Sequence, residues 1–176
     1  MYDIPFFNYP AIYKRFESEF DGIFKDVCSR GAFILQRDLD DFESRLGKFL
    51  DVNHALGVAD GTNAMIIGLK AMGIGEGDEV IIASHTYIAT AASIKLVGAI
   101  PVFADIGDDY MMSAASAAQK ITPKTKAVIP VHLYGCMVDM DRIMEIANKN
   151  NINTCITYFR SHSRLIRCEA SKFFTI

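Results

Sequence analysis

The chain has 176 residues, of which 51% are hydrophobic and 22% charged, with a formal net charge of −3. This composition is typical of one packed core and excludes a disordered chain and a basic nucleic-acid-binding protein. No apolar run approaches a membrane span and the first residues lack a signal-peptide core, so we expect a cytoplasmic protein without membrane association. The four cysteines show no C-x-x-C spacing, which predicts reduced thiols and no metal site.

Two amphipathic helices are predicted before the first strand. Apolar residues recur at helical spacing from Phe16 to Val27, and again from Leu39 to Phe49. We expect the first helix to pack its apolar face against the core. The charges around Glu43 in the second helix are interpreted as a solvated face.

The stretch 57–106 alternates short apolar runs with segments of helical pattern. We predict strands over three of these runs, 55–58, 79–83 and 101–104. Further along, the pattern predicts two helices and one buried strand, at 112–120, 139–150 and 127–133. Such alternation is typical of an α/β fold with a parallel sheet.

The junction Asp60-Gly61-Thr62-Asn63 joins the first predicted strand to a helix. Backbone N–H groups are free at a helix start, and the Thr62 and Asn63 side chains add further donors, so this turn is a candidate anion site. An ordinary capped helix without a ligand is the alternative, because Thr and Asn are favoured at helix N-caps.

The loop Ser84-His85-Thr86-Tyr87 follows the strand predicted over 79–83. In a parallel sheet, loops at the carboxyl ends of adjacent strands share one crevice, so Tyr87 can face the Gly61 turn. A phosphate seat beside an aromatic face suits a planar phosphorylated cofactor.

Asp105 and His132 are two further polar residues at predicted strand ends. Asp105 either faces the crevice or closes the loop that follows it, and the sequence favours neither interpretation. His132 lies in an apolar run, where a core histidine is the simpler interpretation. No nearby Ser or Cys nucleophile pattern supports a hydrolase triad.

Four segments, GTNA, GDEVIIASHTYIATA, GAIPVFADI and ITPKTKAVIPVHLYG, together resemble the DegT/DnrJ/EryC1/StrS family of pyridoxal-phosphate-dependent sugar aminotransferases in order and spacing. The resemblance covers about 33–153. It implies an incomplete large domain of the aspartate-aminotransferase type (fold type I), with a mostly parallel sheet and helices on both faces. It also implies a homodimer, an N-terminal helical segment over 1–30 that helps form the subunit contact, and a partial cofactor-binding domain over 31–157.

The resemblance also implies roles for individual residues. In the family the GT-containing turn holds the phosphate of pyridoxal 5′-phosphate (PLP), which assigns that role to Gly61, Thr62 and Asn63. The aromatic residue of the T-[FY] pair stacks on the pyridine ring, and here that residue is Tyr87.

Thr86 and His132 are weaker candidates beside the cofactor. The implied reaction moves an amino group, commonly from glutamate, to a keto group of a nucleotide-linked sugar, in polysaccharide or antibiotic-sugar biosynthesis. The family's Schiff-base lysine motif and its pyridine-pairing Glu-Asp motif do not occur in this chain, so we assign no catalytic residue and expect no activity alone. The alternatives are a sugar dehydratase of the same family and a non-catalytic binding or regulatory module.

The family pattern stops near Tyr158. When residues 159–173 are back-translated with permitted codons and translated one nucleotide later, they give SAHTHGSYGAKRQN, which resembles the family's continuation. We therefore expect 158–176 to be an out-of-frame tail, in which Ser161, His162 and Ser163 have no catalytic role; a genuine divergent end is the alternative. A sheet cut short in this way would expose an unpaired edge, which predicts poor solubility.

Overall fold

The computed structural model describes residues 8–160, 163–170 and 173–175. The chain divides into two compact units, Met1–Phe42 and Glu43–Ile176. Its α-helices are α1 Tyr9–Arg30, α2 Arg37–Leu50, α3 Gly61–Ala71, α4 Ile88–Leu96, α5 Ala114–Gln119 and α6 Met140–Asn150. Its strands are β1 Glu79–Ala83, β2 Ile100–Ala104, β3 Thr125–Ile129, β4 Val131–His132, β5 Asn153–Arg160, β6 Ser163–Ala170 and β7 Phe173–Thr175, and a 3-10 turn, η1, spans Leu133–Gly135.

Helix α1 dominates the first unit. Asn8 caps its start by accepting the Ala11 N–H at 3.1 Å, and Gly31 ends it with a φ of 62°. The predicted helix is confirmed, but its predicted packing against the core is wrong, because no residue of α1 is buried. Phe24, on the apolar face, is 69% exposed. Within residues 8–42 no sheet exists for that face to cover.

The second unit is built on one sheet with the strand order β2-β1-β3-β5-β6-β7, in which β4 also pairs with β5. Pairing is parallel from β2 through β5 and antiparallel from β5 to β7. No helix in the described part of the chain is long and apolar enough to cross a membrane. The predicted α/β class with a mostly parallel sheet is confirmed.

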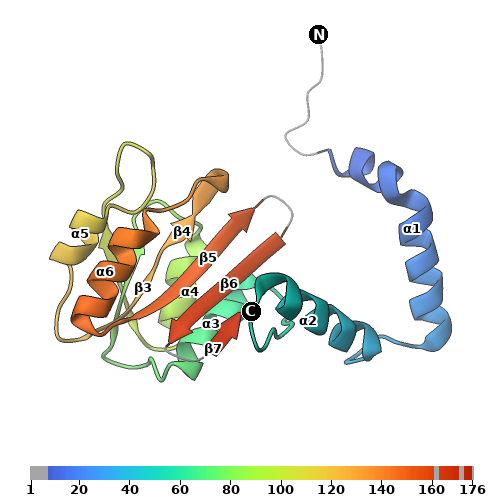
Figure 1. The fold of residues 1–176 in the computed structure, drawn as a ribbon, viewed down its shortest axis with the longest axis horizontal. Helices are drawn as coiled ribbons and strands as arrows, with labels where there is room; N and C mark the ends of the chain where they lie inside the picture. Colours follow the sequence, from blue (N-terminus) through green and yellow to red (C-terminus); the bar gives the residue numbers. More distant parts are fainter. Residues whose placement is uncertain (1–7, 161–162, 171–172, 176) are drawn as a thin grey trace, which may run out of the picture. The chain divides into compact units, whose positions relative to one another are not determined.

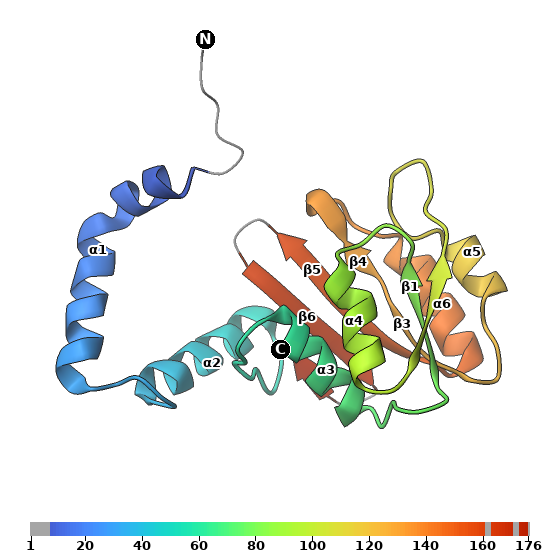
Figure 2. The same ribbon diagram turned by 180° about the vertical axis from the view of Figure 1, so that it is seen from behind.

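Helices cover both faces of this sheet. In β1, Val80 and Ile82 contribute to one buried cluster with residues of α3 and α4, whereas Ile81 and Ala83 contribute to a second cluster with residues of α5 and α6. Figure 1 shows α5 and α6 on the near face, and Figure 2 shows α3 and α4 on the other. Burial on both faces explains the continuous apolar runs of β1 and β3.

The strand predicted over 55–58 is absent, and this prediction is wrong. That segment contains only an isolated bridge at Ala55. The Gly57 N–H, which a strand would direct to a neighbouring strand, is instead donated to Glu43 Oε1 at 2.7 Å. Glu43 is therefore half-buried and bonded to backbone, and the interpretation of its carboxylate as part of a solvated face is also wrong.

The strand predicted over 127–133 is two strands. Pro130 has no N–H to donate, so β3, which pairs with β1 and β5, ends at Ile129, and β4 continues the pairing with β5. The helix predicted over 112–120 begins later, at Ala114, because the Ser113 hydroxyl accepts the Ser116 N–H at 3.3 Å as an N-cap. The helix predicted over 139–150 is confirmed as α6.

The predicted out-of-frame tail overlaps the end of β5 and contains β6 and β7. The backbone of β6 pairs antiparallel with β5, and β7 pairs with β6. Ser161 and His162 lie outside the described residues, and Ser163 begins β6. Whether this segment is read in the native frame stays a prediction.

Candidate functional site

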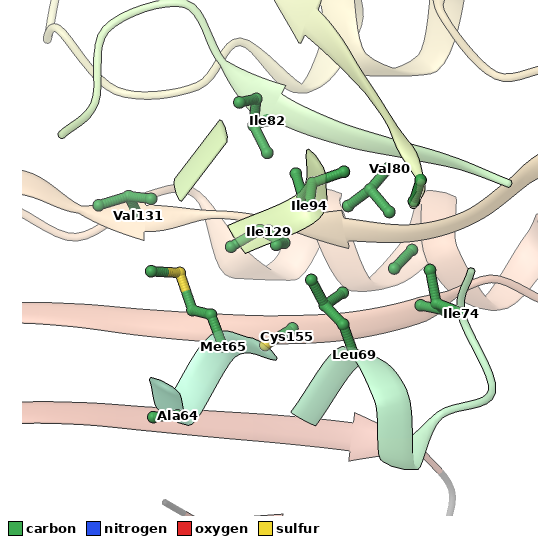
Figure 3. Packing of buried hydrophobic residues seen from close by; sticks show 12 residues of the cluster. Ala64, Met65, Leu69, Ile74, Val80, Ile82, Ile94, Ile129, Val131 and Cys155 are labelled. Carbon is green, nitrogen blue, oxygen red and sulfur yellow. The ribbon is translucent and has the colours of Figure 1, made fainter. Parts of the chain in front are cut away.

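The start of α3 lies at the carboxyl edge of the parallel strands. Buried residues of α3 share one cluster with β1 and β4. In Figure 3, Met65 from the first half of α3 lies toward Val131, and Leu69 lies toward Val80. Val80 is near the start of β1, whereas Val131 follows the end of β3. Helix α3 therefore runs antiparallel to β1, and its N-terminus reaches the edge where β1 and β3 end.

The chain leaves adjacent strands in opposite directions at this edge. From β1 it passes through α4 to β2, which precedes β1 in the strand order. From β4, which follows β3, it passes through η1 and α6 to β5, which lies beyond β3 in the strand order. Helix α4 lies on the first face and α6 on the second. In open α/β sheets such a reversal leaves a crevice outside the carboxyl ends of the strands, where ligands bind.

The turn at Gly61 combines free donors with a capped helix start. Asp60 is the N-cap of α3, and its Oδ1 accepts the Asn63 N–H at 2.9 Å. Asp60 O accepts the Ala64 N–H at 3.0 Å. The Gly61 and Thr62 N–H groups have no acceptor among the described residues. The start of α3 is thus capped and keeps two donors at its positive end, and anion binding there stays a prediction.

Asn63 faces Asp60 with its side chain as well as its backbone. Its Nδ2 donates to Asp60 Oδ2 at 2.9 Å. Of the predicted phosphate-binding residues, Gly61 and Thr62 therefore keep donors available at the helix start, whereas the backbone N–H and one side-chain N–H of Asn63 are directed to the carboxylate.

The loop after β1 carries the predicted ring-stacking residue. Tyr87 is the N-cap residue of α4, makes no side-chain cap and is 53% exposed. Thr86 Oγ1 lies 3.1 Å from Thr90 Oγ1, a hydrogen bond that fixes Thr86 against the first turn of α4. The fold thus brings Tyr87, Thr86 and the α3 start to the same edge of the sheet, as the sequence predicts.

A group of three aromatic rings also lies at this edge. The His85 ring centroid is 6.4 Å from that of Tyr110 and 5.9 Å from that of Tyr134. Both tyrosines have left-handed backbones, with φ of 64° and 55°, an arrangement that costs energy and is frequent at functional sites. His85 Nδ1 is buried without a hydrogen-bond partner among the described residues. Sequence reasoning assigned no role to His85 or Tyr110, and the one available signal was the position of His85 shortly after β1.

His132 has the character of a core histidine. It is 3% exposed, and its Nδ1 accepts the Val138 N–H at 3.1 Å, which links β4 to the segment before α6. Burial lowers the pKa of His132 below its ordinary value, so the neutral ring is favoured. These contacts give His132 a structural role at the crevice wall.

Asp105 closes the loop after β2. Its Oδ2 accepts the Ser116 hydroxyl at 3.3 Å, and its own N–H donates to Ser116 Oγ at 2.9 Å. Its carbonyl accepts the Ser113 N–H at 2.9 Å. Of the two interpretations left open by the sequence, these bonds to α5 support loop closure.

Comparisons with known proteins agree with this geometry. The model of the DegT/DnrJ/EryC1/StrS aminotransferase family matches residues 14–155. The dTDP-3-amino-3,4,6-trideoxy-alpha-D-glucose transaminase of Streptomyces venezuelae is 34% identical over 93% of this chain and 44% of its own length. DesV of S. venezuelae, solved in complex with a ketimine intermediate, superposes with a TM-score of 0.85 at 30% identity, over 90% of this chain and 49% of that chain.

A second structure, NtdA from Bacillus subtilis, was solved with the bound cofactor PMP. It superposes with a TM-score of 0.73 at 33% identity, over 75% of this chain and 31% of that chain. The chain thus spans less than half the length of these relatives. The family match covers most of the chain, and these structures share its α/β fold. The chain belongs to the DegT/DnrJ/EryC1/StrS aminotransferase family.

Proposed function

We propose that this chain supplies the phosphate- and ring-holding part of the cofactor site in a PLP-dependent aminotransferase. The whole enzyme would transfer an amino group, from glutamate, to a keto group of a nucleotide-linked sugar. The observation that carries the proposal is the meeting of two features at one sheet edge: the α3 start with unused N–H groups, and the exposed Tyr87 ring. The relatives' names support the substrate class.

The residues at this edge fit a phosphorylated pyridine. Gly61 and Thr62 offer two backbone donors and a hydroxyl, and the aligned peptide dipoles of α3 favour negative charge there. Tyr87 is 53% exposed at this edge, so it offers aromatic surface to a ligand. A flat ring stacked on Tyr87 would be held in its plane, while the phosphate contacts would set its rotation.

PLP, when bound, supplies a carbonyl that reacts with amines and a ring that accepts electrons from the substrate. This chain's own residues bind the phosphate and orient the ring. The His132 ring, held neutral and bonded to the Val138 N–H, supports the crevice wall from β4.

The exposed lysines of the sheet layers lie at the wrong edge to react with the cofactor. Lys70 and Lys95 are in the last turns of α3 and α4, and Lys126 is near the start of β3. The last turns of α3 and α4 lie at the amino edge of the sheet, because both helices run antiparallel to β1. The start of β3 lies at the same edge. We therefore assign no Schiff-base lysine to them.

We further propose that the working enzyme is a homodimer. The apolar face of α1 supports this, since Phe20, Ile23 and Phe24 are 45%, 60% and 69% exposed. Burying such a face against a second copy removes apolar surface from water at about 25 cal/mol per Å².

Binding of pyridoxamine 5′-phosphate tests the cofactor role without requiring a lysine. Isothermal calorimetry on the full chain should show tighter binding of pyridoxamine 5′-phosphate than of pyridoxamine, which lacks the phosphate. Thr62→Val should reduce that preference, because it removes a hydroxyl donor. Tyr87→Leu should weaken both ligands, because it removes the stacking surface. Phe103→Leu is the matched control, since Phe103 is 51% exposed but belongs to β2 and not to the loop that carries Tyr87.

Equal affinity for the two ligands in the wild-type chain would contradict the proposal. So would an effect of Phe103→Leu as large as that of Tyr87→Leu, because general loss of apolar surface would then explain both.

A further inference from the structure

Asp60 places a carboxylate at the helix end where the phosphate is proposed to bind. Its Oδ1 takes the Asn63 N–H at 2.9 Å, and its Oδ2 takes the Asn63 side-chain amide at 2.9 Å. The backbone of Asp60 is extended, with φ of −166° and ψ of 174°, as N-cap residues commonly are. Two bonds thus join the carboxylate to one residue, Asn63.

These bonds use the groups that a phosphate would otherwise contact. The first turn of α3 offers the N–H groups of Gly61, Thr62 and Asn63, and Asp60 already accepts from the last of them. The helix end carries a partial positive charge of about +0.5 that stabilises nearby anions. A bound phosphate would share this partial charge with the Asp60 carboxylate and would meet a like charge beside it.

We propose that Asp60 sets the affinity of this site by acting as a built-in competitor of the phosphate. Its carboxylate occupies the Asn63 donors when no phosphate is bound, and must share or release them when one binds. This inference rests on the proposed function, because it assumes that the phosphate binds at the α3 start. It makes Asp60 a residue that tunes cofactor retention rather than a ligand of the cofactor.

Asp60→Asn separates the charge from the cap. Asn is as good an N-cap as Asp, so α3 should keep its start. The Asn side chain keeps one oxygen to accept the Asn63 N–H, but its amide nitrogen cannot accept from Asn63 Nδ2, so the Asn63 amide is released. Asp60→Ser is a second neutral variant that also caps, should the first fail to fold.

Asp139→Asn is the matched control. Asp139 is the N-cap of α6 and accepts the Arg142 N–H at 3.2 Å, in the same pattern that Asp60 makes with Asn63. Like Asp60→Asn, this variant loses one negative charge and keeps the same kind of cap. Because α6 lies on the other face of the sheet, the change is away from the α3 start. Thermal unfolding of all variants checks that the caps are retained.

The experiment is calorimetry of the full chain with pyridoxamine 5′-phosphate and with pyridoxamine. Asp60→Asn should tighten pyridoxamine 5′-phosphate binding about tenfold, equal to about 1.4 kcal/mol. It should leave pyridoxamine binding unchanged. Asp139→Asn should change the affinity for neither ligand. The inference is overturned if the wild-type chain prefers the phosphorylated ligand and Asp60→Asn does not strengthen that preference. If neither protein shows a phosphate preference, the proposed function fails and the inference fails with it.

Discussion

The carboxylate of Glu43 accepts the Gly57 N–H shortly before the turn that begins α3. Residues 56–58 form no strand, so their backbone groups depend on other partners. A half-buried N–H that loses its acceptor costs about 1–3 kcal/mol, and a charged acceptor makes the bond stronger. Glu43 therefore helps to fix the segment that leads into the Gly61 turn.

Replacing Glu43 with Ala should lower the free energy of unfolding by about 1–3 kcal/mol, whereas Glu43→Gln, which keeps an acceptor oxygen, should lose less. Urea unfolding followed by circular dichroism measures the difference. Glu145→Ala on the exposed surface of α6 is the control and should stay within about 0.5 kcal/mol of wild type. Equal losses for the Ala and Gln variants would show that the bond to Gly57 contributes nothing.

Burial depresses the pKa of His132 in the folded chain. A histidine kept neutral by folding binds fewer protons than in the unfolded chain, so stability rises with pH between the folded and unfolded pKa values. Its contribution is fully present above about pH 6.5, the unfolded value, and is lost as the pH falls toward the folded value.

The stability of the wild-type chain should therefore fall from pH 7.5 to pH 5.5 more than that of His132→Asn, whose side-chain oxygen can still accept the Val138 N–H. Urea unfolding at several pH values measures this difference. Parallel pH profiles for the two proteins would contradict a buried, neutral His132.

Helix α3 is the element that joins the core to the site. Leu69 is fully buried against β1 and α4, and Ser93 Oγ of α4 lies 3.7 Å from Met65 Sδ of α3. Rigid packing of this kind fixes where the N-terminus of α3 lies relative to the loop after β1. Loosening the helix should therefore affect both stability and ligand binding.

Leu69→Ala should cost about 2–5 kcal/mol of unfolding free energy, as expected for a large buried side chain that leaves a cavity. Ile67→Ala in the same helix is the control, since Ile67 is 41% exposed and should cost much less. Denaturant unfolding of both variants checks this. Similar costs for the two would mean that α3 is not packed as described.

Sequence patterns predicted the elements whose signals are local. The helix over 139–150 has a clear apolar period and the strand over 79–83 is a continuous apolar run, and both are confirmed. The strand over 55–58 failed because a short apolar run does not reveal whether a neighbouring strand exists to pair with it. The Glu43 bond to Gly57 and the His85 ring group join residues distant in sequence, and no period or spacing encodes such contacts.

The apolar face of α1 is exposed, and the chain spans less than half the length of its relatives. If α1 mediates association of two copies, Phe24→Glu should shift the chain toward monomer, because a charge would then be buried in the contact. Leu96→Glu is the control. Leu96 lies at the end of α4, and its side chain is 65% exposed, close to the 69% of Phe24. Sedimentation velocity over a range of concentrations decides this. A wild-type chain that is monomeric at all concentrations would contradict the proposed homodimer.

We also retain the proposal that residues from about Tyr158 are out of frame. The family model's match ends at residue 155, whereas the match to the S. venezuelae transaminase covers 93% of the chain and so extends beyond Tyr158. DNA sequencing across the codons for 150–176 and beyond should find the family's serine-phenylalanine-lysine motif in the shifted frame. Confirmation of the present frame, with no such motif following, would contradict the proposal.

The central claim is that the start of α3 holds a phosphate beside Tyr87. Backbone amide NMR of the ¹⁵N-labelled chain tests it most directly, since each N–H reports its own contacts. Addition of pyridoxamine 5′-phosphate should shift the Gly61 and Thr62 amide resonances more than any in α5 or α6, and pyridoxamine should leave them nearly unchanged. Shifts that are absent at Gly61 and Thr62, or equal for the two ligands, would contradict the claim.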